Sequence, residues 1–78
     1  MNYPELENVK PIEDYKLILF YKGISERIFD VNPYIKGDWY SELRDKEYFK
    51  SVKVVGSTVE WEGGQDIAPH ELYELSVG

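Results

Sequence analysis

The stretch from Tyr15 to Tyr21 reads YKLILFY, and its pattern decides the fold. Its centre, Leu17 to Phe20, is a continuous run of four apolar residues. Such a run is typical of a central strand that is covered on both faces. The following residues, KGIS, include Gly23, which readily adopts the positive φ of a hairpin turn. We therefore predict a strand over 15–21 at the centre of an antiparallel sheet.

Strands are also expected on both sides of this stretch. In ERIFDV, Phe29 and Val31 would share one face, whereas Ile28 and Asp30 would share the other. Acids within strands usually point to water, so Asp30 is interpreted as a surface or turn residue and not as a catalytic one. The earlier stretch ELENVKP predicts a first strand, with Pro11 at its end or at a sheet edge. Its inward residues would be Leu6 and Val9.

The stretch NPYIKGDWYSELRDKEYFKS has helical spacing. Trp39 and Leu43 stand four residues apart, which places them on one side of a helix. Asp38 is a candidate cap for this turn, and Asp45 is a candidate cap for a second turn over Lys46 to Phe49. We expect two short helical turns that lie across the sheet, held by the apolar side chains of this stretch.

A second hairpin is predicted from SVKVVG and STVEWEG, joined through Gly56 and Ser57. Val59 and Trp61 alternate with glutamates, which is the pattern of a sheet with one face in water.

The closing stretch APHELYELS predicts a helix, because Pro69 suits a first helical turn. Leu72 and Leu75, with Tyr73 beside them, would form its inward stripe. This order of elements predicts a single small domain over 1–78 of the α+β class, with an antiparallel sheet built from two hairpins.

Composition excludes several classes of function. The 78 residues include no cysteine, so neither disulfides nor thiolate zinc sites can form. Fifteen acids against nine bases give a net charge of −6, which argues against binding nucleic acid unaided. The longest apolar run is too short to span a bilayer, and the first ten residues do not resemble a signal peptide. We therefore expect a cytoplasmic protein that binds no membrane.

The stretch WEGGQDIAPHELYE, 61–74, holds the single histidine and is the best candidate for a metal or acid–base site. His70-Glu71 matches the start of the zinc motif H-E-x-x-H, but Glu74 stands where the second histidine would be. We favour a structural role, in which the glycines form a turn, Asp66 makes a turn hydrogen bond and Glu71 opposes the helix dipole. The alternative is a small-molecule or metal site built from Asp66, His70 and Glu71.

No nucleophile or phosphate-binding motif is present. The chain has no G-x-S-x-G elbow, and its glycine-containing stretch VGSTVEWEGG lacks the G-K-[ST] ending that holds phosphate. We therefore expect no enzymatic activity and no cofactor.

Aromatic residues are the remaining signal, because twelve rings are many for so small a core. We expect Tyr21 and three further tyrosines to reach the surface, and exposed aromatic rings are frequent anchors of protein interfaces. The competing interpretation is that the rings lie with their edges buried and their hydroxyls in water. The predicted interface consists of Tyr34, Trp39, Tyr40, Glu42, Tyr73 and Glu74.

Three stretches together resemble one family: VKPIEDYKLILFYKGISERIFDV, GDWYSELRDKEYFKSVKV and VEWEGGQDIAPHELYE. The most specific part is the closing pattern W-x-x-G-x-D-I-x-P-x-x-L-Y, which starts at Trp61 and ends at Tyr73. On these residues the chain is similar to the bacterial domain of unknown function DUF 2442. His70, directly after Pro69, departs from what is common in this family, because an acid is commoner at that position.

The resemblance implies a small α+β domain with no known catalytic residue. It also implies a gene paired with that of another small protein, in an arrangement similar to toxin–antitoxin modules. We therefore expect a protein-binding module, antitoxin-like, whose partner is a basic protein encoded nearby. A negative surface would speed the encounter with such a partner. The sequence leaves open whether the chain also forms a homodimer.

Overall fold

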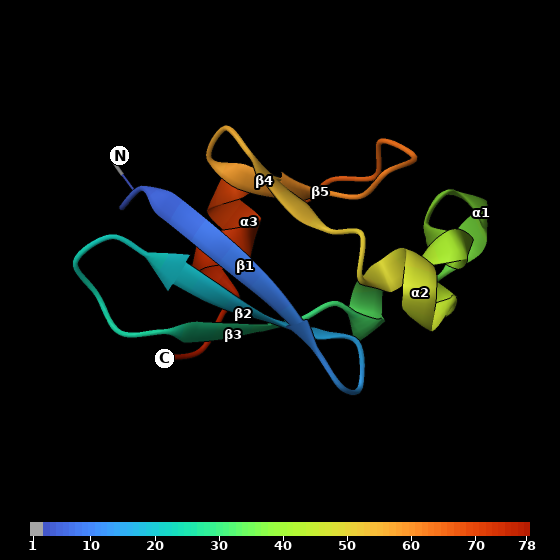
Figure 1. Ribbon diagram of the computed structural model, residues 1–78, viewed down its shortest axis with the longest axis horizontal. Helices are drawn as coiled ribbons and strands as arrows, with labels where there is room; N and C mark the ends of the chain where they lie inside the picture. The colour runs from blue at the N-terminus through green and yellow to red at the C-terminus, as the bar shows by residue number, and fades with distance from the viewer. Residues whose placement is uncertain (1–2) are drawn as a thin grey trace.

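Two antiparallel sheets, four short helical turns and a C-terminal helix form the structure, which confirms the α+β class (Figure 1). The computed structural model describes residues 3–78, apart from the side chain of Trp39. The elements follow one another as β1 (Leu6–Ile12), β2 (Lys16–Tyr21), β3 (Arg27–Asp30), η1 (Asn32–Tyr34), α1 (Gly37–Tyr40), η2 (Ser41–Arg44), α2 (Lys46–Phe49), β4 (Lys53–Val55), β5 (Thr58–Glu60) and α3 (Pro69–Glu74).

The first sheet has the order β1-β2-β3, so the predicted central position of the YKLILFY strand is confirmed. Strands β2 and β3 pair through Leu17 with Phe29 and Ile18 with Ile28. Gly23 in the connecting turn has a φ of 80°, as the hairpin requires. Pro11 pairs with Leu17 near the end of an outer strand of this sheet, where a missing N–H costs least.

A β-bulge explains how two residues of β1 that are three positions apart can both face inward. The pairing with β2 shifts between Leu6 and Asn8, which leaves Glu7 as the additional residue. In regular alternation Leu6 and Val9 would face opposite sides of the sheet. The bulge restores both to the inner face, where Leu6 is buried and Val9 packs on the core.

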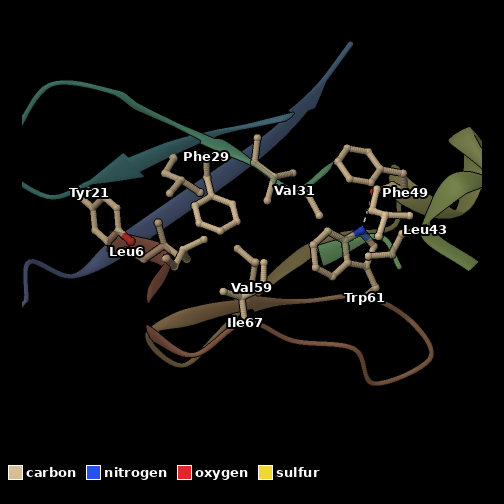
Figure 2. Close-up of a cluster of buried hydrophobic side chains, with 13 residues drawn as sticks. Leu6, Tyr21, Phe29, Val31, Leu43, Phe49, Val59, Trp61 and Ile67 are labelled. Carbon is tan, nitrogen blue, oxygen red and sulfur yellow. Dashed lines mark hydrogen bonds between the residues drawn. The ribbon is translucent and has the colours of Figure 1, made fainter. Parts of the chain in front are cut away.

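One expectation for β2 is wrong: its two faces are not equally covered. Leu17 and Leu19 are fully buried, whereas Ile18 and Phe20 are partly exposed. The core lies between the inner face of the sheet and the β4–β5 hairpin, as Figure 2 shows. Among residues 3–78, no helix or strand covers the outer face, so the apolar run has one buried side.

The turn between β1 and β2 is strained. Asp14 and Tyr15 have φ values of 63° and 58°, a region that residues other than glycine seldom adopt. Two hydrogen bonds hold the turn: Asn32 Nδ2 donates to the Asp14 carbonyl at 2.7 Å, and the Val31 N–H donates to the Tyr15 carbonyl at 3.0 Å. The ring of Tyr15 also packs on Phe49, with ring centroids 5.3 Å apart.

The helical stretch lies beyond the end of the first sheet and not across it, which corrects the predicted placement (Figure 1). Leu43 and Phe49 are buried and connect this stretch to the core. Asp45 caps α2 as predicted, since its carboxylate accepts a hydrogen bond from the Glu47 N–H at 3.0 Å. The predicted cap at Asp38 is wrong, because α1 begins after Lys36 and has no side-chain cap.

The two aspartates make a matched test of capping. Replacing Asp45 with alanine should lower the free energy of unfolding by about 1 kcal/mol, because an N–H of the first turn of α2 loses its acceptor. Replacing Asp38 with alanine should change it by less than about 0.5 kcal/mol, as expected for a surface side chain. Urea denaturation measures both values, and equal losses would contradict the assignment.

The second hairpin forms a sheet of its own. Val54 pairs with Val59, and Gly56 in the turn has a φ of 61°. The predicted inward residues are confirmed, because Val59 and Trp61 are both 0% exposed. The Trp61 indole N–H donates to the Phe49 carbonyl at 2.9 Å, the bond drawn in Figure 2. This contact attaches the hairpin to the end of α2.

Helix α3 packs on the core through fewer residues than predicted. Pro69 stands in its first turn, and Leu72 is fully buried, both as expected. Leu75 is 62% exposed, so its assignment to the inward stripe is wrong. The helix ends at Glu74, and Leu75 is therefore its C-cap residue and not part of another turn.

Candidate functional site

Three of the predicted interface residues meet where the helical turns lie beside the loop that precedes α3. They come together with two carboxylates that belonged to the alternative metal site. Hydrogen bonds and ring contacts link η1, α1 and η2 to this loop and to α3. We call this group the acidic–aromatic seam; it consists of Tyr34, Tyr40, Glu42, Asp66 and Glu71.

Tyr34 occupies the inner end of the seam. Its ring packs between Phe29, at a centroid distance of 5.6 Å, and Tyr40, at 6.1 Å. Its hydroxyl donates to Glu71 Oε1 at 2.7 Å. Burial, and next this hydrogen bond, raise the pKa of Tyr34 to about 12. The hydroxyl therefore remains protonated and joins η1 to α3.

Tyr40 and Glu42 occupy the outer part of the seam. The Tyr40 hydroxyl donates to the Asp66 carbonyl at 2.9 Å, and Gln65 Nε2 donates to Glu42 Oε1 at 3.0 Å. Burial, followed by the charges of Asp66 and Glu71, raises the pKa of Tyr40. The two carboxylates near Tyr40 make this part of the surface negative, which suits cations and opposes anions.

Alkaline pH should destabilise the fold through Tyr34. Its pKa is 10.0 in the unfolded chain and about 12 in the folded one, so the folded chain binds more protons between these values. The free energy of unfolding should therefore be at its full value below pH 10 and should fall as the pH rises towards 12. Urea denaturation at about pH 9 and about pH 11 measures this fall. It should be smaller in Tyr34→Phe, and an equal fall in both proteins would refute the assignment.

A buried amide network supports the seam, and sequence reasoning missed it. Gln65 is buried although it lies in a loop. The Gly63 N–H donates to the Tyr48 hydroxyl oxygen at 2.5 Å, and this hydroxyl donates to Gln65 Oε1 at 2.8 Å. The Gln65 amide nitrogen, Nε2, then donates to Glu42 Oε1. The network fixes the loop whose backbone receives the Tyr40 hydrogen bond.

Tyr73 and Glu74 form a second cluster, separate from the seam in its contacts. The Tyr73 ring lies 5.1 Å from that of Tyr21 and 5.4 Å from that of Tyr3. The Tyr3 hydroxyl donates to Glu74 Oε2 at 2.9 Å. Tyr21 was expected at the surface, and this expectation is wrong: its ring is buried, and burial raises its pKa to about 12.

Arg27 holds this second cluster against the first sheet. Its Nε donates to Ser76 Oγ at 2.6 Å, and its Nη2 donates to the Ser76 carbonyl at 2.6 Å. Its guanidinium lies 4.8 Å from the centre of the Tyr73 ring, a cation–π contact. Arg27 therefore fixes the residues that follow α3. A cation at this position also interacts favourably with the negative C-terminal end of the helix dipole.

The predicted interface residues are thus divided between two clusters, except for one whose side chain the structure does not describe. The side chain of Trp39 is not among those that the structure describes. The half-buried tyrosines pack against the core, which agrees with only one part of the competing interpretation of the aromatic excess. Most of their hydroxyls bond protein groups and not water alone, so these tyrosines also act as structural links.

The three residues of the alternative metal site lie close in sequence but make different contacts. His70 and Asp66 are exposed, whereas Glu71 is partly buried and accepts the Tyr34 hydrogen bond. Over residues 3–78, no group of three or more acidic, histidine or cysteine side chains is arranged to hold a metal ion. The corner instead supplies turn and helix-start geometry, with Gly64 at a φ of 96°. The predicted turn hydrogen bond of Asp66 is wrong, because the described hydrogen bonds reach its backbone carbonyl and not its carboxylate, and α3 has no side-chain cap.

Comparisons with known proteins add a family but no function. The family model described as Protein of unknown function (DUF2442) matches residues 6–78, nearly the whole chain. No curated protein and no solved structure matches the chain. In the described part of the chain, every helix is too short or too polar to cross a membrane.

Proposed function

The chain belongs to this family of proteins of unknown function, and we propose that it is a non-catalytic protein-binding module. The acidic–aromatic seam carries the proposal. Tyr34 and Tyr40 present partly exposed rings beside the carboxylates of Asp66 and Glu71. Such a surface suits Arg and Lys side chains of a partner, because guanidinium groups stack on tyrosine rings and pair with carboxylates.

Charge supports a basic partner. The chain has a net charge of −6, and Asp38, Glu42 and Asp66 are all exposed. Complementary charges steer partners together and mainly raise the rate of association. The same charge repels phosphate backbones, so we propose no binding of nucleic acid by the isolated chain.

The resemblance described above supplies the identity to test first. We propose that the partner is a small basic protein encoded by the neighbouring gene, with this chain as the antitoxin-like member, in the cytoplasm of a bacterium. The seam would then bind the partner directly. This proposal needs no catalytic group, metal or cofactor in the chain.

Co-expression with the product of the neighbouring gene tests the proposal. The informative variant is Asp38→Lys with Asp66→Lys, because neither carboxylate receives a hydrogen bond from the described residues. We expect binding at least about tenfold weaker. The matched control is Glu5→Lys with Glu7→Lys, which makes the same charge change at exposed positions at and next to β1. Failure of the two proteins to co-purify, or equal binding by both variants, would refute the proposal.

A further inference from the structure

The outer face of the three-stranded sheet is a second surface, distinct from the seam. Ile28 is 41% exposed and Val77 is 69% exposed, and Ile18 and Phe20 are partly exposed beside them. Isolated exposed apolar residues are common, whereas contiguous ones mark interaction surfaces. With Lys16 and Asp30, these four residues define what we call the outer face.

The strand register places these residues in rows. Ile18 pairs with Ile28, and Ile28 forms an antiparallel bridge with Val77, so the three form one apolar row. In the neighbouring row on the same face, Lys16 pairs with Asp30. A shallow hollow on this face is lined by residues of β2, of β3 and its preceding turn, and of the C-terminal end: Lys16, Ile18, Glu26, Ile28, Val77 and Gly78.

These rows are self-complementary. A two-fold axis parallel to the strands, between β2 and β3, would place β2 of one copy over β3 of the other. Ile18 of each copy would then face Ile28 of the other copy, and Lys16 would face Asp30. We propose that two copies of this chain associate through their outer faces in this arrangement.

Charge favours a second copy over other occupants. A uniformly basic partner, as proposed for the seam, would be repelled by Lys16, and a uniformly acidic one by Asp30. Both groups have capacity for a further ion pair. Lys16 forms none within residues 3–78. The described hydrogen bonds to the Asp30 carboxylate, from Asn32 N at 3.0 Å and Asn32 Nδ2 at 2.8 Å, both end on Oδ1.

The size of the face predicts a weak dimer. Aligned sheets pack about 10 Å apart with their strands about 30° from parallel, which lets the two apolar rows interdigitate. Three short strands spaced by about 4.8 Å give a face much smaller than the roughly 800 Å² per partner of stable complexes. We therefore expect dissociation constants in the micromolar to millimolar range.

Sedimentation equilibrium of the purified chain, from about 1 µM to about 1 mM, tests the proposal. The wild type should pass from monomer to dimer with rising concentration. Ile28→Lys should remain monomeric, whereas Val55→Lys should dimerise like the wild type; both positions are 41% exposed apolar residues, but Val55 lies in the other sheet. Circular dichroism checks that each variant is folded.

A second pair of variants keeps the test decisive if Ile28→Lys fails to fold. Lys16→Glu places like charges over Asp30 of the other copy and should weaken the dimer at least about tenfold. Lys22→Glu makes the same charge change at an exposed turn and should leave association close to that of the wild type. A wild type that stays monomeric throughout overturns the proposal. So does a dimer that neither Ile28→Lys nor Lys16→Glu weakens.

Discussion

Replacing Trp61 with alanine should remove a large part of the free energy of unfolding. Trp61 is completely buried, and its ring lies 5.8 Å from that of Phe49. Tryptophan-to-alanine changes in cores cost about 3–5 kcal/mol. A chain of 78 residues has a total stability of about 4–12 kcal/mol, so the loss is a large part of it. Urea denaturation followed by circular dichroism measures the change.

Trp61→Phe is the matched control for this prediction. It keeps an aromatic ring in the core but removes the indole N–H that donates to the Phe49 carbonyl. The expected loss is therefore smaller, about 1–3 kcal/mol, which combines an unpaired carbonyl with the lost volume. If Trp61→Ala lost less than about 1 kcal/mol, the hairpin would not depend on this contact as the structure indicates.

Replacing Gly63 with alanine should have the next largest effect, about 1–3 kcal/mol. A Cβ at this position would lie 2.3 Å from the Tyr48 hydroxyl oxygen and 3.0 Å from Gln65 Oε1. The hydroxyl cannot move away freely, because it accepts from the Gly63 N–H and donates to Gln65. The cost arises from close packing and not from φ, which is not positive at Gly63.

A double-mutant cycle with Tyr48→Phe tests the cause. Removing the hydroxyl removes the atom that the new Cβ meets, so Gly63→Ala should cost much less in Tyr48→Phe than in the wild type. Contacting residues typically show coupling energies of about 0.5–3 kcal/mol. Additive losses in the cycle would show that the contact with the Tyr48 hydroxyl is not the source of the cost. Urea denaturation of the four proteins supplies the values.

The parts of the fold that the sequence predicted rest on short-range patterns. The hairpin through Gly23, the cap at Asp45 and the alternation around Val59 each depend on residues within a few positions. Periodicity and turn chemistry act over this range. The errors at Leu75 and Asp38 have a related origin, since each depends on where a short helix begins or ends.

The contacts that define the candidate site join distant residues. Gln65 reaches Glu42 across 23 positions, and Arg27 reaches Ser76 across 49. Such pairs leave no periodic signal in one sequence, so neither was predicted. A buried glutamine in a glycine-containing loop also contradicts the usual preference of its residue type for the surface. Composition did indicate the seam in outline, because it identified Tyr34, Tyr40 and Glu42 as surface candidates.

The outer face shows why the apolar run of β2 was misjudged. Leu17 to Phe20 was interpreted as a strand covered on both sides, yet one side remains open within the described chain. The pattern and the structure agree if a second copy supplies the missing cover. The sedimentation experiment above therefore also tests the original interpretation of the sequence.

The central claim is that the corner over 61–74 shapes the backbone and presents a binding surface, with no ligand held between His70 and its acidic neighbours. The most direct test is the thermal unfolding midpoint of the wild type and of His70→Ala, with and without Zn²⁺, Mn²⁺ or Mg²⁺. A bound ion stabilises the folded state, and this stabilisation grows with the logarithm of the ion concentration once that concentration exceeds the dissociation constant. We predict that each ion changes the midpoints of the two proteins equally or not at all. An ion that stabilises the wild type and loses this effect in His70→Ala would contradict the claim.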